Sequence, residues 1–365
     1  TLFRSMMTES TSPALESSLP PCRRMVILTE GHTTPFYAKT AMSLLRYRAA
    51  DVLALLDASQ AGQTAEDLLG MNGQTPIAGS LAEVDSPDSL VLGIAPPGGK
   101  LPQAWRDVIV DAIVRGLDIV SGLHDFLSDD QQFAELAQRH GVRLVDVRQN
   151  QENTPSDCIT FRPECLRIHT VGNDCSVGKM VTAIEVQQDL VERAVDARFV
   201  ATGQTGIMVS GDGTPVDCVV SDFVNGAAER LVLRNQHHDV LLIEGQGCIT
   251  HPRFSGVTLG MLHGCAPQGL ILCYEVGRKS VKGLDHVPIE PLGKLRDIYE
   301  TIASTRYPCR VIGVAMNSRS VDEDAAEIER KRVESELGLP ACDVYRHGPG
   351  LLAESVLALR AELMT

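Results

Sequence analysis

The sequence predicts an α/β protein of two domains, each built on a mostly parallel, doubly wound sheet. The length of 365 residues favours two domains over one. Strand-like apolar runs alternate with helix-like segments along both halves, which is the pattern of successive βαβ units. A polar stretch without periodicity, QNQENTPSDC at 149–158, interrupts the alternation and predicts a linker between the domains.

The first half, residues 23–150, is expected to form a Rossmann-like domain. Its expected strands are the apolar runs MVILTEG (25–31), DVLALLD (51–57), SLVLGIA (89–95), LDIVSGLH (117–124) and VRLVDVR (142–148). Its expected helices lie at 37–47, 104–116 and 129–141. It contains no G-x-G-x-x-G motif, so its nucleotide-binding signature is weak. Residues 1–22 are rich in Ser, Thr and Pro and lack the apolar core of a signal peptide, so we expect a loose tail.

The second half, residues 151–365, restarts the alternation and is expected to form a P-loop NTPase-like domain. Its expected strands lie at 165–171, 196–206, 239–247, 269–277 and 310–318. Its expected helices lie at 179–194, 217–235, 320–338 and 348–363. Ligands of such sheets bind outside the carboxyl ends of the strands, so we expect a cleft where this edge faces the first domain.

The stretch VGNDCSVGKM at 171–180 resembles a phosphate-binding loop between a strand and a helix. Gly178 and Lys179 occupy the expected positions, whereas Gly172 lies one residue earlier than in G-x-x-x-x-G-K-[ST]. Met180 replaces the hydroxyl residue that ligates Mg²⁺, and a thioether does not ligate this hard cation. Either Mg²⁺ is bound in another way, or the loop holds a phosphate that is never cleaved. The candidate residues for holding it are Gly172, Asn173, Asp174, Cys175, Ser176, Val177, Gly178, Lys179, Met180 and Thr182.

Three side chains at expected strand ends or loops are the candidate catalytic groups. Glu244 ends the strand VLLIEGQG in a Walker B-like position, where it either helps to hold Mg²⁺ through water or acts as a general base. Asp174 lies inside the phosphate loop, and His251 follows the Glu244 strand in a glycine-rich loop. A rigid, partly desolvated setting raises the pKa of a carboxylate, so Glu244 is our first choice for the base.

The segment YEVGRKSVKG (274–283) places Arg278, Lys279 and Lys282 within five residues, just after a strand-like run. These cations are candidates for binding the carboxylates of an acidic substrate, and the alternative is a solvated basic turn. Further candidate substrate contacts are Thr205, Asp222 and Ser255. Asp217 is explained by capping of the helix expected there.

The charge balance excludes several classes of partner. The net charge of −14, from 33 basic and 47 acidic residues, argues against a nucleic-acid or anionic-membrane partner. No apolar run approaches the ~20 residues of a membrane span. The ten cysteines form no C-x-x-C pair, so we expect no metal site and instead buried free thiols in a reducing cytoplasm. The sequence leaves homo-oligomerisation open.

The second half resembles a large bacterial and archaeal P-loop family long described as a domain of unknown function. The resemblance rests on five motifs in order: VGNDCSVGKM, ATGQTGIMVSGDG, SDFVNGAAE, VLLIEGQGCITHP and SGVTLGMLHG. Members of this family have been identified as D-glutamate N-acetyltransferases. The resemblance is densest over 168–283, and Asn173 stands where the family pattern leads us to expect Thr. The resemblance implies a Rossmann-like domain and a P-loop domain. It also implies that acetyl-CoA is the acetyl donor and that a small-molecule amino acid is the acceptor, with D-glutamate as the first candidate.

A more distant similarity is to dethiobiotin synthetase, which shares the longer loop spacing and an acid–glycine strand end. It leaves open an ATP- and Mg²⁺-dependent ligase or carboxylase, and a non-catalytic nucleotide-binding protein is a third alternative. Under acetyl transfer, the loop holds the pyrophosphate of acetyl-CoA without cleaving it, which would explain Met180. No Cys-His-Asp arrangement with a recognisable nucleophile signature appears, so we expect direct transfer to the amine and no acyl-enzyme.

Overall fold

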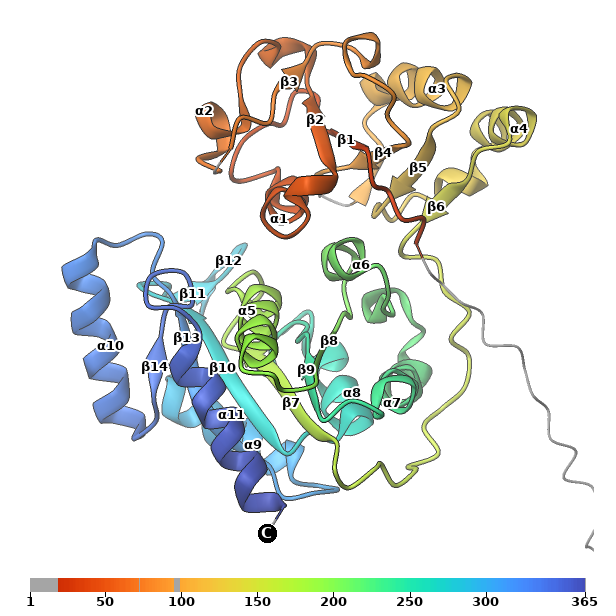
Figure 1. Cartoon of the computed structure of the whole chain (residues 1–365). Coiled ribbons are helices and arrows are strands. Elements are labelled where there is room, and N and C mark those ends of the chain that lie inside the picture. Colours follow the sequence, from red (N-terminus) through yellow and green to blue (C-terminus); the bar gives the residue numbers. More distant parts are fainter. Residues whose placement is uncertain (1–18, 72, 95–98, 365) are drawn as a thin grey trace, which may run out of the picture.

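The computed structural model describes residues 19–71, 73–94 and 99–364. They form two α/β domains, one above the other in Figure 1, and each domain contains a six-stranded parallel sheet. The predicted architecture of two parallel-sheet domains is therefore confirmed. Residues 1–18 of the expected tail lie outside the described residues, whereas Cys22 near its end is buried.

The first sheet has the strand order β3-β2-β1-β4-β5-β6. Its strands are β1 (Met25–Leu28), β2 (Val52–Leu56), β3 (Ile77–Ala78), β4 (Ser89–Leu92), β5 (Asp118–Ser121) and β6 (Leu144–Asp146). Its helices are α1 (Lys39–Tyr47), α2 (Ala65–Leu69), α3 (Arg106–Val114) and α4 (Gln131–His140). The chain adds β2 and β3 on one side of β1 and β4 on the other, so β1 adjoins the topological switch point.

Both faces of the first sheet are buried, because side chains alternate between the faces along each strand. On β1, Met25 and Ile27 pack in one apolar cluster with Leu44 of α1. Val26 and Leu28 pack on the opposite face with the apolar residues of α3 and α4. This two-sided burial explains why β1 is apolar at every position.

The second sheet has the strand order β14-β13-β10-β7-β9-β8. Its strands are β7 (Leu166–Gly172), β8 (Ala197–Val200), β9 (Val240–Ile243), β10 (Gly269–Glu275), β13 (Arg310–Asn317) and β14 (Ala341–Cys342), and a hairpin of β11 (Ser280–Val281) and β12 (Leu284–Pro288) follows β10. The chain places β8 and β9 on one side of β7 and β10 on the other, so the phosphate loop after β7 lies at the switch point of this sheet.

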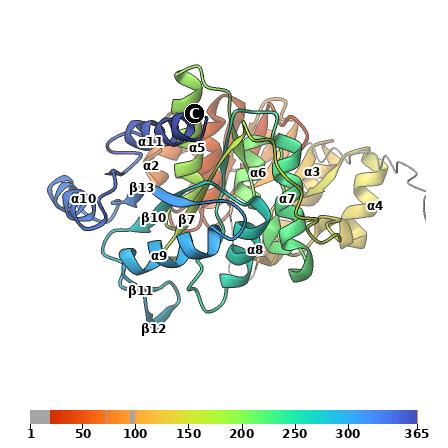
Figure 2. The same cartoon turned by 90° about the horizontal axis from the view of Figure 1, so that it is seen from below.

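Helices cover both faces of the second sheet. They are α5 (Lys179–Glu192), α6 (Gln204–Ser210), α7 (Val224–Asn235), α8 (Ser255–Cys265), α9 (Leu292–Ala303), α10 (Glu323–Leu337) and α11 (Gly350–Leu363). Figure 2 shows α5 and α11 on one side of β7 and β10, and α8 and α9 on the other. Among the described helices, none combines the length and the apolar character that crossing a bilayer requires.

The first domain contacts the second chiefly through α1, which lies against α6 (Figure 1). The hydroxyl oxygens of Thr40 on α1 and Thr205 on α6 lie 2.9 Å apart. Gly122, just after β5, approaches Gln204, just after β8, so closely that a Cβ on Gly122 would lie 1.5 Å from Oε1 of Gln204. The carboxyl edge of the second sheet therefore faces the first domain, as the sequence predicted.

The structure differs from the expectation before α7. The helix expected to begin at Asp217 begins at Val224, because two separate 3-10 turns, Val216–Cys218 and Ser221–Phe223, precede it. The prediction that Asp217 caps a helix is wrong: its carboxylate pairs with Arg148 at the end of the first domain. The helices α2, α6, α8 and α9 and the short strands β3, β11, β12 and β14 have no counterpart among the expected elements.

Candidate functional site

The phosphate loop runs from the end of β7 into α5. Ser176 has a φ of +57° and Gly178 a φ of +106°, so the backbone adopts left-handed conformations twice before the helix begins. Within the described ranges, the N–H groups of Ser176, Val177 and Gly178 have no hydrogen-bond acceptor. Unpaired N–H groups at the positive end of a helix favour an anion, so the backbone geometry supports the predicted phosphate site.

The predicted ligand-binding residues in the first turn of α5 differ in what they contact. Lys179 is almost fully buried, and its Nζ donates to the carbonyl oxygen of Asp174 at 2.7 Å. Met180 is half-buried and packs against an apolar cluster, so its thioether contributes to the core. Thr182 is 3% exposed, and its Oγ1 accepts from the thiol of Cys273 at 3.7 Å. Burial against β10 leaves Thr182 no surface for a ligand, contrary to the expectation.

Asp174 is fully buried, and both of its carboxylate oxygens are occupied. Oδ1 accepts from the N–H of Cys175 at 2.7 Å. Oδ2 accepts from Nη1 of Arg278 and from the N–H of Lys282, both at 2.8 Å. The side chain thus ties the phosphate loop to the segment after β10. A carboxylate with these partners and no exposed surface is poorly placed to take a proton from a substrate, so the geometry favours an anchoring role over that of a base.

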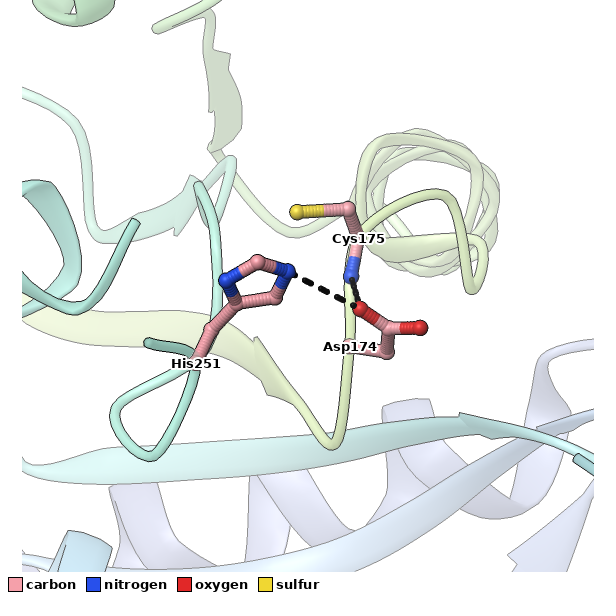
Figure 3. Close-up of side chains that lie close together, drawn as sticks. All are labelled: Asp174, Cys175 and His251. Atoms are coloured by element: carbon pink, nitrogen blue, oxygen red, sulfur yellow. Dashed lines mark hydrogen bonds and ion pairs between the residues drawn. The ribbon is translucent and has the colours of Figure 1, made fainter. Parts of the chain in front are cut away.

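His251 and Cys175 lie beside Asp174 (Figure 3). A histidine nitrogen, the cysteine sulfur and a carboxylate oxygen lie within 4.8 Å of one another, a spacing compatible with a three-ligand metal site. The N–H of Arg253, however, donates to Nδ1 of His251 at 3.1 Å, so the proton of the neutral ring is on Nε2, which lies 3.5 Å from Oδ1 of Asp174. A protonated Nε2 has no lone pair for a metal ion or for a substrate proton.

The same cluster bears on covalent catalysis. Burial lowers the pKa of His251, and burial raises the pKa of the Cys175 thiol. A neutral imidazole and an uncharged thiol are therefore expected near neutral pH. Because the thiolate is the nucleophile, the pair lacks the activation that an acyl-enzyme needs. Direct transfer stays a prediction, and this geometry supports it.

Glu244 follows β9 and is 5% exposed. Its Oε2 accepts from the N–H groups of Thr202 and Gly203 at 2.9 and 3.0 Å, whereas Oε1 has no hydrogen-bond partner in the described part of the chain. Burial raises the pKa of Glu244 to about 7, although the two N–H donors and Lys179 act in the opposite direction. One oxygen is held and the other is free, with a pKa near neutrality, which suits a general base.

Gly245 brings the end of the Glu244 strand against the phosphate loop. A Cβ at this position would lie 1.7 Å from the carbonyl oxygen of Thr170 and 3.0 Å from Cδ of Lys179. Glycine permits this approach because it has no Cβ. The candidate base and the lysine of the loop are therefore neighbours.

The three predicted substrate cations have different environments. Arg278 donates to Asp174 through Nη1 and to Oε2 of Glu275 through Nη2, at 2.8 and 2.5 Å, so the protein itself neutralises its charge. Lys279 and Lys282 are exposed, and neither has a carboxylate within ion-pair distance among the described residues. Arg278 is therefore part of the scaffold, and only the two lysines remain available to a substrate.

Lys279 lines a cavity of about 350 Å³ that begins at the phosphate loop. Asn173 lines the same cavity, and its buried Oδ1 has no hydrogen-bond partner in the part of the chain that the structure describes. A buried acceptor without a partner is costly in a folded protein, so this oxygen is suited to a ligand donor. Asn173 therefore remains a candidate ligand residue through its side chain as well as its backbone.

The remaining expected substrate contacts do not converge. Thr205 is engaged with Thr40 across the domain boundary. Ser255 begins α8, and its N–H donates to the carbonyl oxygen of His251 at 3.1 Å. Asp222 is exposed in the turn before α7 and has no polar partner among the described residues. Of the three, only Ser255 is tied to a candidate catalytic residue.

One residue of the site gave no sequence signal. Tyr299 on α9 is fully buried, and its hydroxyl donates to the carbonyl oxygen of Gly172 at 2.7 Å. The same hydroxyl accepts from the N–H of Ile249 at 3.0 Å. Tyr299 therefore joins the start of the phosphate loop to the loop that carries His251. Because α9 itself was not expected, no pattern pointed to this tyrosine.

Comparisons with known proteins agree with this architecture. Residues 155–353 match the P-loop domain of a family described as a domain of unknown function, DUF1611. Residues 58–150 match the Rossmann-like N-terminal domain of the same family.

Relatives match most of the chain. A D-glutamate N-acetyltransferase of Tritonibacter scottomollicae is 39% identical over 289 residues, which cover 79% of this chain and 86% of the relative. A second D-glutamate N-acetyltransferase, of Pseudoalteromonas sp, is 37% identical over 267 residues, covering 71% and 78%. The crystal structure of a DUF1611 family protein from Anabaena variabilis matches with a TM-score of 0.86 and 36% identity, covering 92% of this chain and 99% of that one. The predicted resemblance is confirmed, and the chain belongs to the DUF1611 family.

Proposed function

We propose that this protein transfers the acetyl group of acetyl-CoA to the amine of an amino acid, with D-glutamate as the expected acceptor. The observation that carries the proposal is Glu244, a buried carboxylate with one free oxygen and a pKa raised to about 7, beside a phosphate loop. The relatives named D-glutamate N-acetyltransferase, at 37–39% identity, support the reaction and the acceptor. Ten free cysteines support the expected cytoplasmic location.

The phosphate loop is proposed to hold the pyrophosphate of acetyl-CoA. Its contacts are the unpaired N–H groups before α5, the positive end of that helix and the ammonium group of Lys179. When bound, acetyl-CoA supplies an acetyl group activated as a thioester. Because the pyrophosphate is held and not cleaved, the site does not need the Mg²⁺ hydroxyl that Met180 replaces.

Glu244 is proposed to activate the acceptor. An ammonium group must lose a proton before its nitrogen attacks a thioester, and the free Oε1 of Glu244 is suited to take it. The N–H donors on Oε2 hold the carboxylate in place. The protonated Nε2 of His251 and the N–H groups of the loop are suited to stabilise a developing oxyanion. The net products are the N-acetyl amino acid, the thiol of CoA and one proton.

An ATP- and Mg²⁺-dependent ligase or carboxylase is the second candidate, because the loop and the Walker B-like Glu244 would also suit ATP. The geometry favours it less. Met180 packs against the core, Asp222 is exposed without polar contacts among the described residues, and one oxygen of Glu244 already accepts two N–H groups. A non-catalytic nucleotide-binding protein is the third candidate, and it predicts binding without turnover.

The test of the proposed function is a screen of D- and L-amino acids for thiol release from acetyl-CoA by the purified protein. Thiol release that requires D-glutamate or another amino acid is the expected result. Calorimetric titration with CoA, acetyl-CoA and ATP, each with and without Mg²⁺, separates the alternatives. Tight binding of Mg·ATP without binding of CoA would favour the ligase, and binding without thiol release from any amino acid would favour the non-catalytic protein.

Replacing Lys179 by Met should weaken the donor site. The substitution removes a charged donor from the phosphate loop, and a charge-assisted hydrogen bond corresponds to roughly 10- to 100-fold in affinity. The KM for acetyl-CoA should therefore rise by about tenfold or more, as measured by steady-state thiol release. The control is Lys331→Met on α10, an exposed lysine that pairs only with Glu327 among the described residues. An unchanged KM for acetyl-CoA in Lys179→Met would remove this lysine from the donor site.

A further inference from the structure

Part of the surplus positive charge near the phosphate loop comes from two lysines on different domains. Arg278 and Arg319 both donate to Oε2 of Glu275, at 2.5 and 3.1 Å, and Arg278 also donates to Asp174. These two guanidinium groups are therefore balanced by two carboxylates. The uncompensated charges nearby belong to Lys279 and Lys282, which the sequence indicated, and to Lys39, which it did not; of these, Lys282 and Lys39 lie together.

Lys39 and Lys282 converge on one aromatic ring. The Nζ of Lys39 lies 5.5 Å from the centre of the Phe36 ring, and the Nζ of Lys282 lies 5.4 Å from it. Neither ammonium group has a carboxylate within ion-pair distance among the described residues, although the chain carries a net charge of −14. Phe36 is itself 62% exposed and Lys282 is exposed, whereas Lys39 is half-buried, so the ring and the Lys282 ammonium group are open to a ligand.

Repulsion between the two lysines is expected from this proximity. Burial lowers the pKa of Lys39 to about 8, and the positive charge of Lys282 is the second cause. Two ammonium groups held together without an acidic partner cost free energy unless an anion lies between them. The arrangement therefore favours a bound anion over a free solvated surface.

The position of this pair in the fold points to the reaction centre. Lys39 begins α1, in the connection after β1, at the switch point of the first sheet. Lys282 lies in the turn of the β11–β12 hairpin, and its own N–H donates to Oδ2 of Asp174 in the phosphate loop at 2.8 Å. An anion held by both lysines would thus lie between the two domains and next to the phosphate loop.

We propose that Lys39 and Lys282 form a composite binding site for an anionic group, with one lysine from each domain. The anion is either the side-chain carboxylate of the acceptor or the 3′-phosphate of the donor nucleotide. This identification of the ligand rests on the proposed function, whereas the existence of the anion site rests on the lysine pair. The Rossmann-like domain thereby supplies a specificity-determining residue to a site whose other parts belong to the P-loop domain.

Calorimetric titration distinguishes an anion that belongs to the acceptor from one that belongs to the donor. The probes are glutarate, a dicarboxylate without an amine, and adenosine 3′,5′-bisphosphate, which carries the 3′-phosphate. In Lys39→Gln and in Lys282→Gln, the affinity for one probe should fall by about tenfold or more, because each substitution removes a charged donor. Loss of glutarate binding assigns the site to the acceptor, and loss of bisphosphate binding assigns it to the donor. Lys39→Arg, which keeps the charge, should retain most of the affinity.

A control variant, the melting temperature and the pattern of probe binding decide the proposal. Lys331→Gln, on the exposed face of α10, should bind both probes as the unaltered protein does. The melting temperature of Lys39→Gln should change little, because the substitution removes repulsion and breaks no ion pair among the described residues, while it also removes the contact of the ammonium group with the Phe36 ring. The proposal is overturned if the unaltered protein binds neither probe, or if both lysine variants keep both affinities within about twofold. Absence of thiol release together with lysine-dependent probe binding would reject the acetyltransferase and leave the anion site standing.

Discussion

Glu244→Gln should reduce kcat by about 10²-fold or more and leave the affinity for acetyl-CoA nearly unchanged. The amide keeps the size of the side chain and can still accept from the N–H groups of Thr202 and Gly203 through its oxygen. It cannot take a proton from an ammonium group. Steady-state thiol release measures kcat, and calorimetry with acetyl-CoA measures the affinity.

The pH dependence gives a second test of the same residue. Because the pKa of Glu244 is raised to about 7, its basic form predominates only above neutral pH, so kcat should rise between about pH 6 and 8. Between the ordinary value of 4.5 and about 7, the folded protein keeps a proton that the unfolded chain has lost. The contribution of this group to the free energy of unfolding should therefore decrease as the pH rises through that window. Glu244→Gln should lack this contribution, which urea titrations at several pH values measure.

Glu229→Gln is a matched control. Glu229 is also a buried glutamate whose carboxylate accepts from backbone N–H groups, in this case those of Asp157 and Ile159. It lies in the contact between α7 and the linker, so its replacement should lower stability without a large change in the kcat of the folded protein. A near-normal kcat in Glu244→Gln would move the role of base to another group. Detection of an acetyl-cysteine during turnover would contradict direct transfer.

Periodicity predicted the central strands better than the helices between them. β9 and β10 lie within continuous apolar runs, because strands buried on both faces need mostly apolar side chains, whereas β7 also buries Arg167 and His169. The α8 helix was not predicted, since Gly256, Gly260 and Gly264 have low helix propensity. In the structure two of these glycines permit close packing of α8 on α7. A Cβ added at Gly260 would lie 2.6 Å from a side-chain carbon of Val224, and a Cβ added at Gly264 would lie 2.2 Å from the carbonyl oxygen of Asn225. Tertiary packing thus overrides local propensity.

The parts of the candidate site that lie within one short sequence motif could be predicted from the sequence. The phosphate loop and Glu244 each lie in one short motif after a strand, and the structure places them side by side. The roles of Asp174 and Arg278 depend instead on a hydrogen bond between residues 104 positions apart, which a single sequence does not reveal. The same reason applies to Lys39, whose neighbour Lys282 lies on the other domain.

Asp174→Asn should lower the free energy of unfolding by about 3 kcal/mol, because it removes one partner of a buried charge pair. The carboxylate accepts from Arg278, whose side chain is 12% exposed, and from the N–H of Lys282. The amide would turn a donor toward one of these donors. Urea unfolding of the purified variant measures the loss. Asp111→Asn is the control, since its pair with Arg115 is exposed and should change stability by about 0.5 kcal/mol or less.

A double-mutant cycle separates anchoring from catalysis at this position. Arg278 was expected to bind the substrate, which would make Arg278→Ala raise the KM of the acceptor. The observed pairing predicts instead that Arg278→Ala and Asp174→Asn both lower stability, with a coupling of about 1–3 kcal/mol between them. The kcat of folded Asp174→Asn should fall far less than that of Glu244→Gln, because both oxygens of Asp174 are occupied whereas Glu244 has a free oxygen for the substrate proton. An unchanged urea midpoint combined with a collapse of kcat in Asp174→Asn would instead make Asp174 the base.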